Sequence, residues 1–576
     1  MLQLADIFQP HMTLQRDKTI YVFGTSDPDS SVQAELKQAL SVSMETEKDP
    51  EQAVSGPVTV CSACTKTQDD GSFLLELPPA GAGYGYSLSV TSGDDSITVE
   101  DIQIGDIWMA MGQSNMEYFL RYDADWDYTR LAVHRNGSDR SIRMYNVPQV
   151  AYEGQGDPSP ANGVWFSEGD EPWRSFSAPG YYFAKYLREN GIDIPLAVVG
   201  CNWGGTPAQA WMSRDYLEKE PLSSLLRNYE DAFASVPLDE LKETSMKVWK
   251  AERSYLHEML FRPVLEGLTW TEQLRLMEQP AEVPELPMGP WHHYRPCGVY
   301  RHMVRKIAPF SVKGILWYQG ESNCGEEALI YQATMEALVS CLRNTWMDST
   351  LPFCFVQLAP FTRWLGCTGV GYAIVRQQQD LASASIPDSY VTNVMDLGER
   401  DDIHPKYKKE VGRRLAYLAL QHTYGQTDKT GEAPVFLKAE ECTASDADRD
   451  CSQKGGPFSR RFRLDFGNCG TGLAAEYPFG SAIRVYTEDF DSHSGEWPEG
   501  DCFDLTQEYF TGLTGFDYSR PIPVRNAEIS GSSILFTVDL DRADIPLCIS
   551  FAESDWCEVL VHSSDGIPVK PFHAIL

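Results

Sequence analysis

The chain has 576 residues, a hydrophobic content of 42% and a formal charge of −34. Its length exceeds what one hydrophobic core can hold, and its composition is that of a folded protein, so roughly two to four domains are expected. The charge argues against nucleic acid and anionic membranes as partners, because both need a basic surface. A small anionic substrate is not excluded, since a few local arginines can outweigh a distant field.

Residues 1–104 carry the pattern of a β-rich domain. Runs such as "TIYVFGTS" and "GSFLLELPPA" are short, rich in strand-forming residues and separated by Gly, Asp, Ser and Pro. This pattern predicts an N-terminal β-sandwich-like domain. Cys61 and Cys64 form one C-x-x-C, but no second pair follows at zinc-ribbon spacing, so we expect no metal there.

Between residues 105 and 425, five apolar runs alternate with longer helical stretches. The runs are "DIWMAMG", "IPLAVVGCNWGG", "VKGILWYQGESN", "PFCFVQLAP" and "SYVTNVMD". Continuous apolar runs indicate strands that are buried on both faces, as in a parallel sheet covered by helices. Ligands bind beyond the carboxyl ends of such strands, so we expect the functional site there.

Residues from about 216 to 300 interrupt this alternation with an amphipathic helical stretch and a Pro-rich aromatic loop. A long loop inside a compact domain is more often functional than not. His292 and His293 lie in this loop without a partner at metal-ligand spacing, and we predict that they are exposed. From residue 426 to 576, β-rich runs such as "SSILFTVDL" predict a C-terminal β domain.

The N-terminus lacks the basic start and apolar core of a secretory signal. No apolar run approaches the roughly 20 residues of a membrane span. Fourteen irregularly spaced cysteines are typical of free thiols in a reducing compartment. We therefore expect a cytoplasmic protein, unless an export signal has been removed from the sequence. The oligomeric state stays open.

Four strand ends carry chemically useful side chains. The first, "GQSNM", places Ser114 after a buried run, a pattern that by itself is more typical of an ordinary turn. The second contains Gly204 and Gly205, and the third contains Gln319 and Asn323. The fourth is the most informative, because it places a histidine and aspartates directly before a helix.

In this fourth motif, "ERDDIHPKYKKEVGRRLAYLALQHTYG", Pro405 suits the first turn of a helix. A serine nucleophile needs a base, and the base needs a partner that fixes its tautomer. Asp401 and His404 supply both within one loop. Taken alone, the pattern is explained equally well by a histidine and aspartates that cap the helix.

Asp402 is also close to His404 in sequence. A residue three positions before the histidine can fold back across one turn and accept a hydrogen bond from Nδ1. A residue two positions before it points away in an extended loop and suits a helix cap. We therefore predict that Asp401 orients His404 and that Asp402 caps the helix.

Met116 stands where the α/β-hydrolase elbow Gly-x-Ser-x-Gly needs its second glycine, which disfavours that fold. The ordered motifs instead resemble those of the sialate O-acetylesterases in the SGNH (GDSL-like) hydrolase superfamily. The resemblance covers nearly the whole chain. It is carried by "HMTLQRDKTIYVFGTSDPDSSV", "VEDIQIGDIWMAMGQSNME", "NWGGTPAQAWMS", "KGILWYQGESN", "DDIHPKYKKEVGRRLA" and "GIPVKPFHAIL".

The resemblance implies an α/β fold: a three-layer α/β/α hydrolase domain with a parallel sheet, flanked by N-terminal and C-terminal β-sandwich-like domains. It also implies a serine esterase without metal or other cofactor, whose activity chelators leave unchanged. Ser114 would be the nucleophile, His404 the general base and then acid, and Asp401 the residue that orients His404.

By the same resemblance, the oxyanion hole comprises the backbone N–H of Ser114, the N–H of Gly204 and the side-chain amide of Gln319. Gly205 and Asn323 are the alternatives to the last two. Relatives usually carry an asparagine at the position of Arg301. This extra cation would either bind a sialate carboxylate or point to solvent.

The implied function is that of a carbohydrate O-acetylesterase acting on sialic acids. One alternative is an acetylesterase for xylan or mannan oligosaccharides, since SGNH folds host many esters. A second, from another class, is a non-catalytic carbohydrate-binding protein in which the flanking sandwiches bind the sugar.

Overall fold

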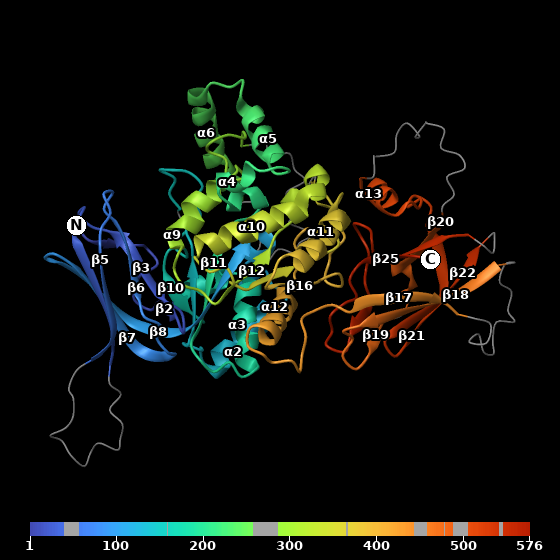
Figure 1. The fold of residues 1–576 in the computed structure, drawn as a ribbon, viewed down its shortest axis with the longest axis horizontal. Coiled ribbons are helices and arrows are strands. Elements are labelled where there is room, and N and C mark those ends of the chain that lie inside the picture. Colours follow the sequence, from blue (N-terminus) through green and yellow to red (C-terminus); the bar gives the residue numbers. More distant parts are fainter. Residues whose placement is uncertain are drawn as a thin grey trace, which may run out of the picture. The chain divides into compact units, whose positions relative to one another are not determined.

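The computed structural model describes residues 1–39, 57–157, 159–256, 286–364, 367–442, 458–476, 478–487, 505–540 and 545–576. The chain divides into two compact units. Unit 1 comprises Met1–Trp317 and Ala337–Phe353, and unit 2 comprises Tyr318–Glu336 and Cys354–Leu576 (Figure 1). Within the described ranges, every helix is too short or too polar to cross a membrane.

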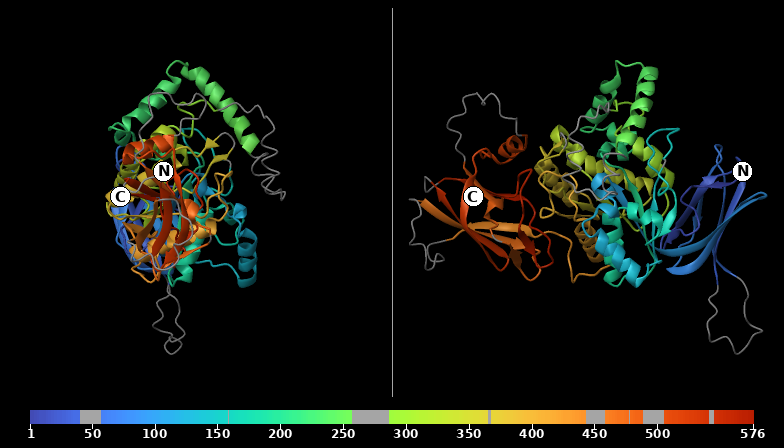
Figure 2. Two further views of the ribbon diagram at one scale, coloured as in Figure 1. Left: turned by 90° about the vertical axis from the view of Figure 1, so that its right-hand side faces the viewer. Right: turned by 180° about the vertical axis from the view of Figure 1, so that it is seen from behind.

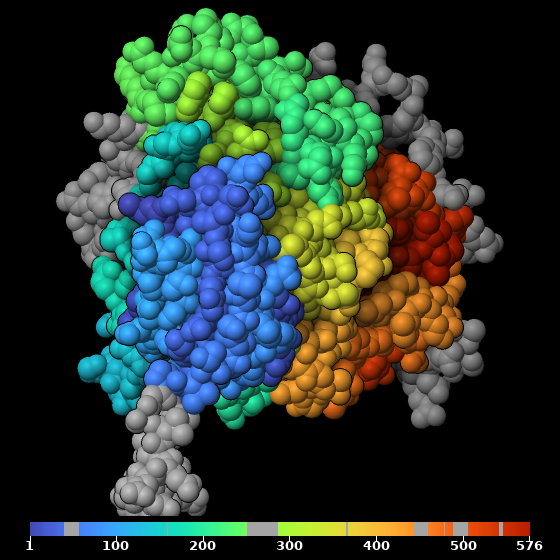
Figure 3. Space-filling model, turned by 60° about the vertical axis from the view of Figure 1, so that its left-hand side comes forward, coloured from blue at the N-terminus to red at the C-terminus, as the bar shows by residue number. Residues whose placement is uncertain are grey.

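The N-terminal part of unit 1 consists of strands, as predicted. One antiparallel sheet has the order β1-β3-β6, with β1 at Gln3–Leu4, β3 at Ile20–Thr25 and β6 at Ser72–Leu77. A second set pairs β5 with β4, β4 with β7 and β7 with β8. Their bounds are Ser31–Gln38 for β4, Val58–Lys66 for β5 and Gly83–Ser92 for β7. Figure 3 shows this region in blue as one continuous surface.

Cys61 and Cys64 both lie on β5, in regular register with β4. Because side chains alternate between the two faces of a strand, residues three apart point to opposite sides of the sheet. The C-x-x-C pair is therefore part of a strand and does not converge on one point.

Strand β8 connects the N-terminal sheet with the α/β part of unit 1. It runs for 18 residues, Asp95–Gly112, and is buried at every position from Ile102 onward. Residues 103–105 pair in parallel with β2 (Thr13–Gln15), and residues 106–112 pair in parallel with β11 (Leu196–Asn202). The last pair in that register is Asn202 with Gly112, so both strands end at the same edge.

The α/β sheet of unit 1 has the strand order β10-β9-β11-β8-β12. The bounds are Ile142–Asn146 for β9, Trp165–Ser167 for β10 and Gly314–Tyr318 for β12. β9 is parallel to β11, and β10 is antiparallel to β9. All residues of β9, β10, β11 and β12 are buried, and so is β8 from Ile102 onward, which confirms the prediction made from the continuous apolar runs.

Helices of unit 1 connect these strands. Their bounds are Ser114–Glu117 (α1), Leu120–Tyr122 (η3), Trp126–Asn136 (α2), Glu171–Ser175 (η4), Ala178–Glu189 (α3), Ala208–Trp211 (η5), Arg214–Leu217 (α4), Ser223–Phe233 (α5), Leu238–Leu256 (α6), Tyr300–Val304 (η7, a π-helix) and Arg305–Ile307 (α9). Ser177 caps α3 by accepting the Gly180 N–H at 3.1 Å, with Pro179 in the first turn.

Helices α5 and α6 project from unit 1 and confirm the helical part of the predicted insertion (Figures 1 and 2). The prediction for residues 257–285 lies outside the described residues. Helix α10 (Tyr331–Thr345) begins in unit 2 and ends in unit 1.

Unit 2 contains the remaining α/β elements. These are η8 (Glu321–Asn323), η9 (Gly325–Ile330), β13 (Phe353–Val356), β14 (Arg363–Trp364), β15 (Cys367–Thr368), α11 (Tyr372–Ser385), β16 (Ser389–Thr392) and α12 (Lys408–His422). The predicted strands at β13 and β16 are confirmed. Helix α12 begins three residues later than the position of Pro405 suggests, so Pro405 belongs to the loop.

The C-terminal part of unit 2 is β-rich, as predicted. Its seven-stranded sheet has the order β17-β18-β22-β21-β20-β23-β25 around a core that includes Phe462, Phe536 and Phe551. The bounds are Val435–Glu441 (β17), Phe458–Gly467 (β18), Ile483–Thr487 (β20), Ile522–Ser530 (β21), Ser533–Leu540 (β22), Leu547–Phe551 (β23) and Phe572–Ile575 (β25). Shorter elements are β19 (Leu473–Ala475), η10 (Gly480–Ala482), α13 (Leu505–Thr514) and β24 (Val561–Ser563).

Candidate active site

Ser114 lies at the end of β8, where a buried strand gives way to a one-turn helix. Gly112 ends the strand with φ at +134°, a conformation that side chains disfavour, and Gln113 beside it is buried. The N–H groups of Met116 and Glu117 both donate to the Gln113 carbonyl at 2.9 Å, which closes the turn. Ser114 is therefore held by a rigid backbone and stays partly exposed.

The glycine turn after β11 packs directly against Ser114. The Trp203 N–H donates to the Gly112 carbonyl at 3.0 Å, so the two strand ends stay paired. A Cβ placed on Gly204 would lie only 3.4 Å from the Ser114 Cβ. Gly205 has φ at +74°, and a Cβ there would come within 1.8 Å of the Tyr294 hydroxyl. Positive φ and close approach thus favour glycine at 205, whereas at 204 a Cβ would make close to ordinary van der Waals contacts with Glu117 and Ser114.

The structure directs the Gly204 N–H toward a carboxylate. This N–H donates to Glu117 Oε2 at 2.6 Å, and Gln149 Nε2 donates to Glu117 Oε1 at 2.9 Å. Burial is the main reason why the pKa of Glu117 is raised, and the charge of Asp157 raises it further. Sequence reasoning missed Glu117, and its place three residues after Ser114 on one helical turn is the signal that could have found it.

Aromatic residues from the insertion cover this glycine turn. The Trp203 ring is stacked on His293, with ring centres 5.0 Å apart, and contacts Trp249 at 6.1 Å. His292 and His293 are each only 7% exposed, so the prediction that they are exposed is wrong. The stacked rings exclude water, and this burial lowers the pKa of His292 to about 4.

In unit 2, the third motif forms a closed hydrogen-bonded group. Gln319 Nε2 donates to Asn323 Oδ1 at 2.7 Å, and Gln319 Oε1 accepts the Tyr331 hydroxyl at 2.7 Å. Asn323 Nδ2 in turn donates to Glu327 at 2.7 Å. Both amides are buried. The structure thus joins the two alternative oxyanion residues into one unit, in which Gln319 orients Asn323.

His404 lies in the loop before α12, as predicted. The positions of the two neighbouring aspartates are the reverse of those predicted, because Asp402 and not Asp401 lies near the imidazole. The His404 Nδ1 atom is 3.9 Å from Asp402 Oδ1, and the His404 backbone N–H donates to the same oxygen at 2.8 Å. The Asp402 side chain is 4% exposed. Burial raises the pKa of Asp402 to about 7, and the charge of Glu399 adds to this.

Asp401 does not contact the imidazole, which corrects the prediction. Glu399 and Asp402 pair as an antiparallel bridge, so Asp401 lies at the tip of the turn between them. Its side chain is 63% exposed, and its oxygen lies 3.5 Å from Arg363 Nε. The spacing argument assumed one helical turn, whereas the loop forms a tight reversal that turns Asp402 inward.

The surroundings of His404 keep it uncharged. Burial lowers the pKa of His404 to about 3, and the charge of Lys408 lowers it as well. The Trp364 ring lies edge-on at 5.2 Å from the imidazole. A neutral imidazole can accept a proton, whereas a pKa this low makes His404 a weak base in the free protein.

These residues belong to two different units. Ser114, Gly204 and Glu117 are organised within unit 1, and His404, Asp402 and the Gln319–Asn323 pair are organised within unit 2.

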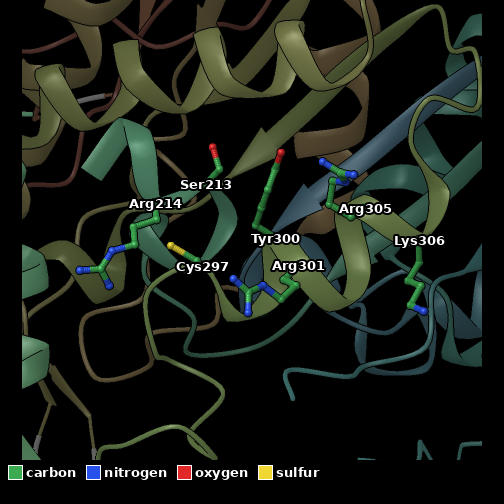
Figure 4. A pocket seen from close by; sticks show the side chains of 7 residues that line it. All are labelled: Ser213, Arg214, Cys297, Tyr300, Arg301, Arg305 and Lys306. Atoms are coloured by element: carbon green, nitrogen blue, oxygen red, sulfur yellow. The ribbon is translucent and has the colours of Figure 1, made fainter. Parts of the chain in front are cut away.

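Arg301 lines a basic hollow in unit 1 (Figure 4). The hollow has a volume of about 460 Å³ and is lined by Ser213, Arg214, Cys297, Tyr300, Arg301, Arg305 and Lys306. Arg214 is held by Glu218 at 2.9 Å and Glu230 at 2.8 Å. Within the part of the chain that the structure describes, no carboxylate pairs with Arg301. The hollow therefore carries net positive charge in a strongly acidic protein.

Comparisons with known proteins agree with this picture. Residues 287–421 match the family of sialic acid-specific acetylesterases among the carbohydrate esterases, and this span includes the third and fourth motifs but not Ser114. The chain is 24% identical to sialate O-acetylesterase from Rattus norvegicus over 470 residues, 76% of each chain. It is 22% identical to the Homo sapiens enzyme over 476 residues, 76% of this chain and 74% of that one.

A solved structure shares the fold. It is a carbohydrate acetylesterase from Xanthomonas citri, with a TM-score of 0.65 and 23% identity over 99% of both chains. The class defined by these findings is that of the carbohydrate esterases. Within that class, the curated relatives to which the chain is similar are sialate O-acetylesterases, the family that its motifs resemble.

Proposed function

We propose that this protein is a carbohydrate O-acetylesterase that removes acetyl groups from sialic acids through a serine nucleophile. The observation that carries the proposal is Ser114, held partly exposed at the end of β8 and beside Gly204. Such a rigid serine beside a glycine turn at a strand end suits acyl transfer.

In the first half of the reaction, Ser114 Oγ attacks the acetyl carbonyl carbon while His404 Nε2 takes its proton. The tetrahedral intermediate then collapses, the bond to the sugar oxygen breaks, and that oxygen takes the proton from His404. This releases the sugar hydroxyl and leaves acetyl-Ser114. In the second half, water attacks this ester with His404 as base, which yields acetate and free serine.

Asp402 takes the orienting role in this proposal in place of Asp401. Its carboxylate lies on the Nδ1 side of His404 and its oxygen is fixed by the His404 N–H. The distance of 3.9 Å from Nδ1 tightens to a hydrogen bond when the imidazole is charged, as catalytic contacts often do in the reacting complex. The oxyanion would be bound by the Ser114 N–H and by the Gln319–Asn323 pair.

The proposal includes a three-layer hydrolase domain at 105–425 between β domains at 1–104 and 426–576. Support comes from the fully buried parallel strands β8, β9 and β11 and from the shared fold with the Xanthomonas citri enzyme. The extra cation at Arg301 favours an anionic sugar, since a guanidinium binds a carboxylate in a bidentate fashion; the hollow that it lines does not include Ser114 or the glycine turn.

Acetate release from acetylated sialic acids, xylan oligosaccharides and mannan oligosaccharides tests the function directly. We expect the sialic acids to give the highest kcat/KM. A preference for xylan or mannan would show that the proposed substrate is wrong, while the proposed reaction would still hold. A stoichiometric organophosphonate label on Ser114 is also expected, and its absence together with no acetate release would indicate a carbohydrate-binding protein.

A further inference from the structure

Glu117 is a partly buried carboxylate that the mechanism above does not use. It lies on the same turn of α1 as Ser114, and its two oxygens accept hydrogen bonds from the Gly204 N–H and the Gln149 amide. Within the described ranges, no arginine, lysine or histidine forms an ion pair with it. Burying a carboxylate without a neighbouring cation costs free energy, so we expect this carboxylate to have a specific role.

Glu117 is the junction of three segments that are distant in sequence. Besides binding Glu117, Gln149 Nε2 donates to the Asn202 carbonyl at 3.1 Å. Asn202 Nδ2 donates to the Ala110 carbonyl at 3.1 Å. The nucleophile helix, the end of β11 and the loop after β9 are thus connected through one carboxylate and its neighbours.

The Gly204 N–H has one hydrogen to donate, and at 2.6 Å it is directed at Glu117 Oε2. A Cβ on the same glycine would lie 3.3 Å from Glu117 Oε2 and 3.4 Å from the Ser114 Cβ, so the Gly204 backbone lies directly beside the nucleophile. A shift of the Gly204 backbone would therefore change the space in which the acetyl group has to lie.

We propose that Glu117 is a positioning residue that fixes the Gly204 backbone against Ser114, an inference that rests on the proposed function. The acceptor atom of Glu117, not its charge and not its bulk, carries the effect.

Two substitutions separate these properties. Glu117→Gln keeps an acceptor oxygen and removes the charge, whereas Glu117→Leu keeps the volume and removes the acceptor. We expect Glu117→Leu to lower kcat on a small acetyl ester about 10- to 100-fold with KM within threefold. Glu117→Gln should retain kcat within about threefold of wild type. The matched control is Glu189→Gln, at an exposed glutamate of α3, which should change neither value.

Hydrogen exchange of the peptide Asn202–Thr206 measures the bond without relying on activity. We expect one amide in this peptide to exchange at least tenfold faster in Glu117→Leu and at the wild-type rate in Glu117→Gln. Equal kcat in both variants, whether retained or lost, would overturn the inference, and so would unchanged exchange in Glu117→Leu. If wild type releases no acetate, the proposed function fails, while the exchange result still decides whether Glu117 holds Gly204.

Discussion

Ser114 and His404 each have a carboxylate two or three residues away in the chain, but the N–H groups that bind these two carboxylates come from very different distances along the sequence. Glu117 accepts an N–H from Gly204, 87 residues away, across the paired ends of β8 and β11. Asp402 accepts an N–H from His404, two residues away, within a single turn. The nucleophile region is therefore assembled by strand pairing, and the base region by a local turn.

This difference has a physical consequence. The contact of Glu117 exists only when the sheet of unit 1 has formed, because strand pairing brings its partners together. The contact of Asp402 with the His404 N–H is a short-range turn that the segment can form by itself. Substitutions in the first region should act through the geometry of Ser114, and those in the second through the protonation and orientation of His404.

The largest expected effect is at the nucleophile. Ser114→Ala should lower kcat by at least about 10⁴-fold, because removal of a nucleophile leaves only the contributions of binding and the oxyanion hole. The melting temperature should stay near wild type, since a partly exposed turn side chain contributes little to stability. Acetate release and thermal unfolding measure both quantities. Activity near wild type would show that the strand end of β8 is not the site of attack.

The second expected effect tests the base region. Asp402→Asn should lower kcat by about 10³- to 10⁴-fold, because an amide in this place favours the wrong tautomer of His404. Asp401→Asn is the matched control and should stay within about threefold, since exposed ion pairs contribute little. Steady-state kinetics of both variants decide between the aspartates. The reverse result would restore the choice made from sequence spacing.

A smaller effect concerns the positive charge of Arg301 and its contribution to substrate binding. Arg301→Asn should raise KM for an acetylated sialic acid about tenfold, the loss of roughly 1.4 kcal/mol of binding. A neutral xylan oligosaccharide should be cleaved as before. Arg135→Asn, an exposed arginine outside the hollow, serves as control. An equal rise in KM for the anionic and the neutral substrate would mean that Arg301 does not recognise the charge of the substrate.

The last expected effect is on stability and depends on pH. The pKa of Asp402 is raised from 3.8 to about 7, so the folded protein binds this proton more tightly than the unfolded chain. Its contribution to stability is present below pH 3.8 and is lost as pH rises to about 7. Asp402→Asn should therefore gain melting temperature relative to wild type across that window. A constant difference would argue that Asp402 titrates normally.

The sequence by itself determined the strands of the α/β part. Buried parallel strands must be apolar on both faces, so runs such as "DIWMAMG" and "IPLAVVGCNWGG" reveal β8 and β11 without any tertiary information. The same runs indicate Ser114 and Gly204 as candidate site residues, because the residues that follow each run lie at the edge of the sheet where the parallel strands end. His404 is nominated in the same way by the loop and helix around it.

The folded backbone, in local turns as well as in tertiary contacts, decided which groups those residues meet. Asp401 and Asp402 are equivalent by composition, and only the reversal at Glu399–Asp402 turns one inward and the other to solvent. Glu117 gained a partner through the pairing of β8 with β11, and His293 became buried because it stacks on Trp203. Sequence patterns report the average environment of a strand or helix, whereas individual contacts depend on backbone direction at turns and on segments that meet only in the folded chain.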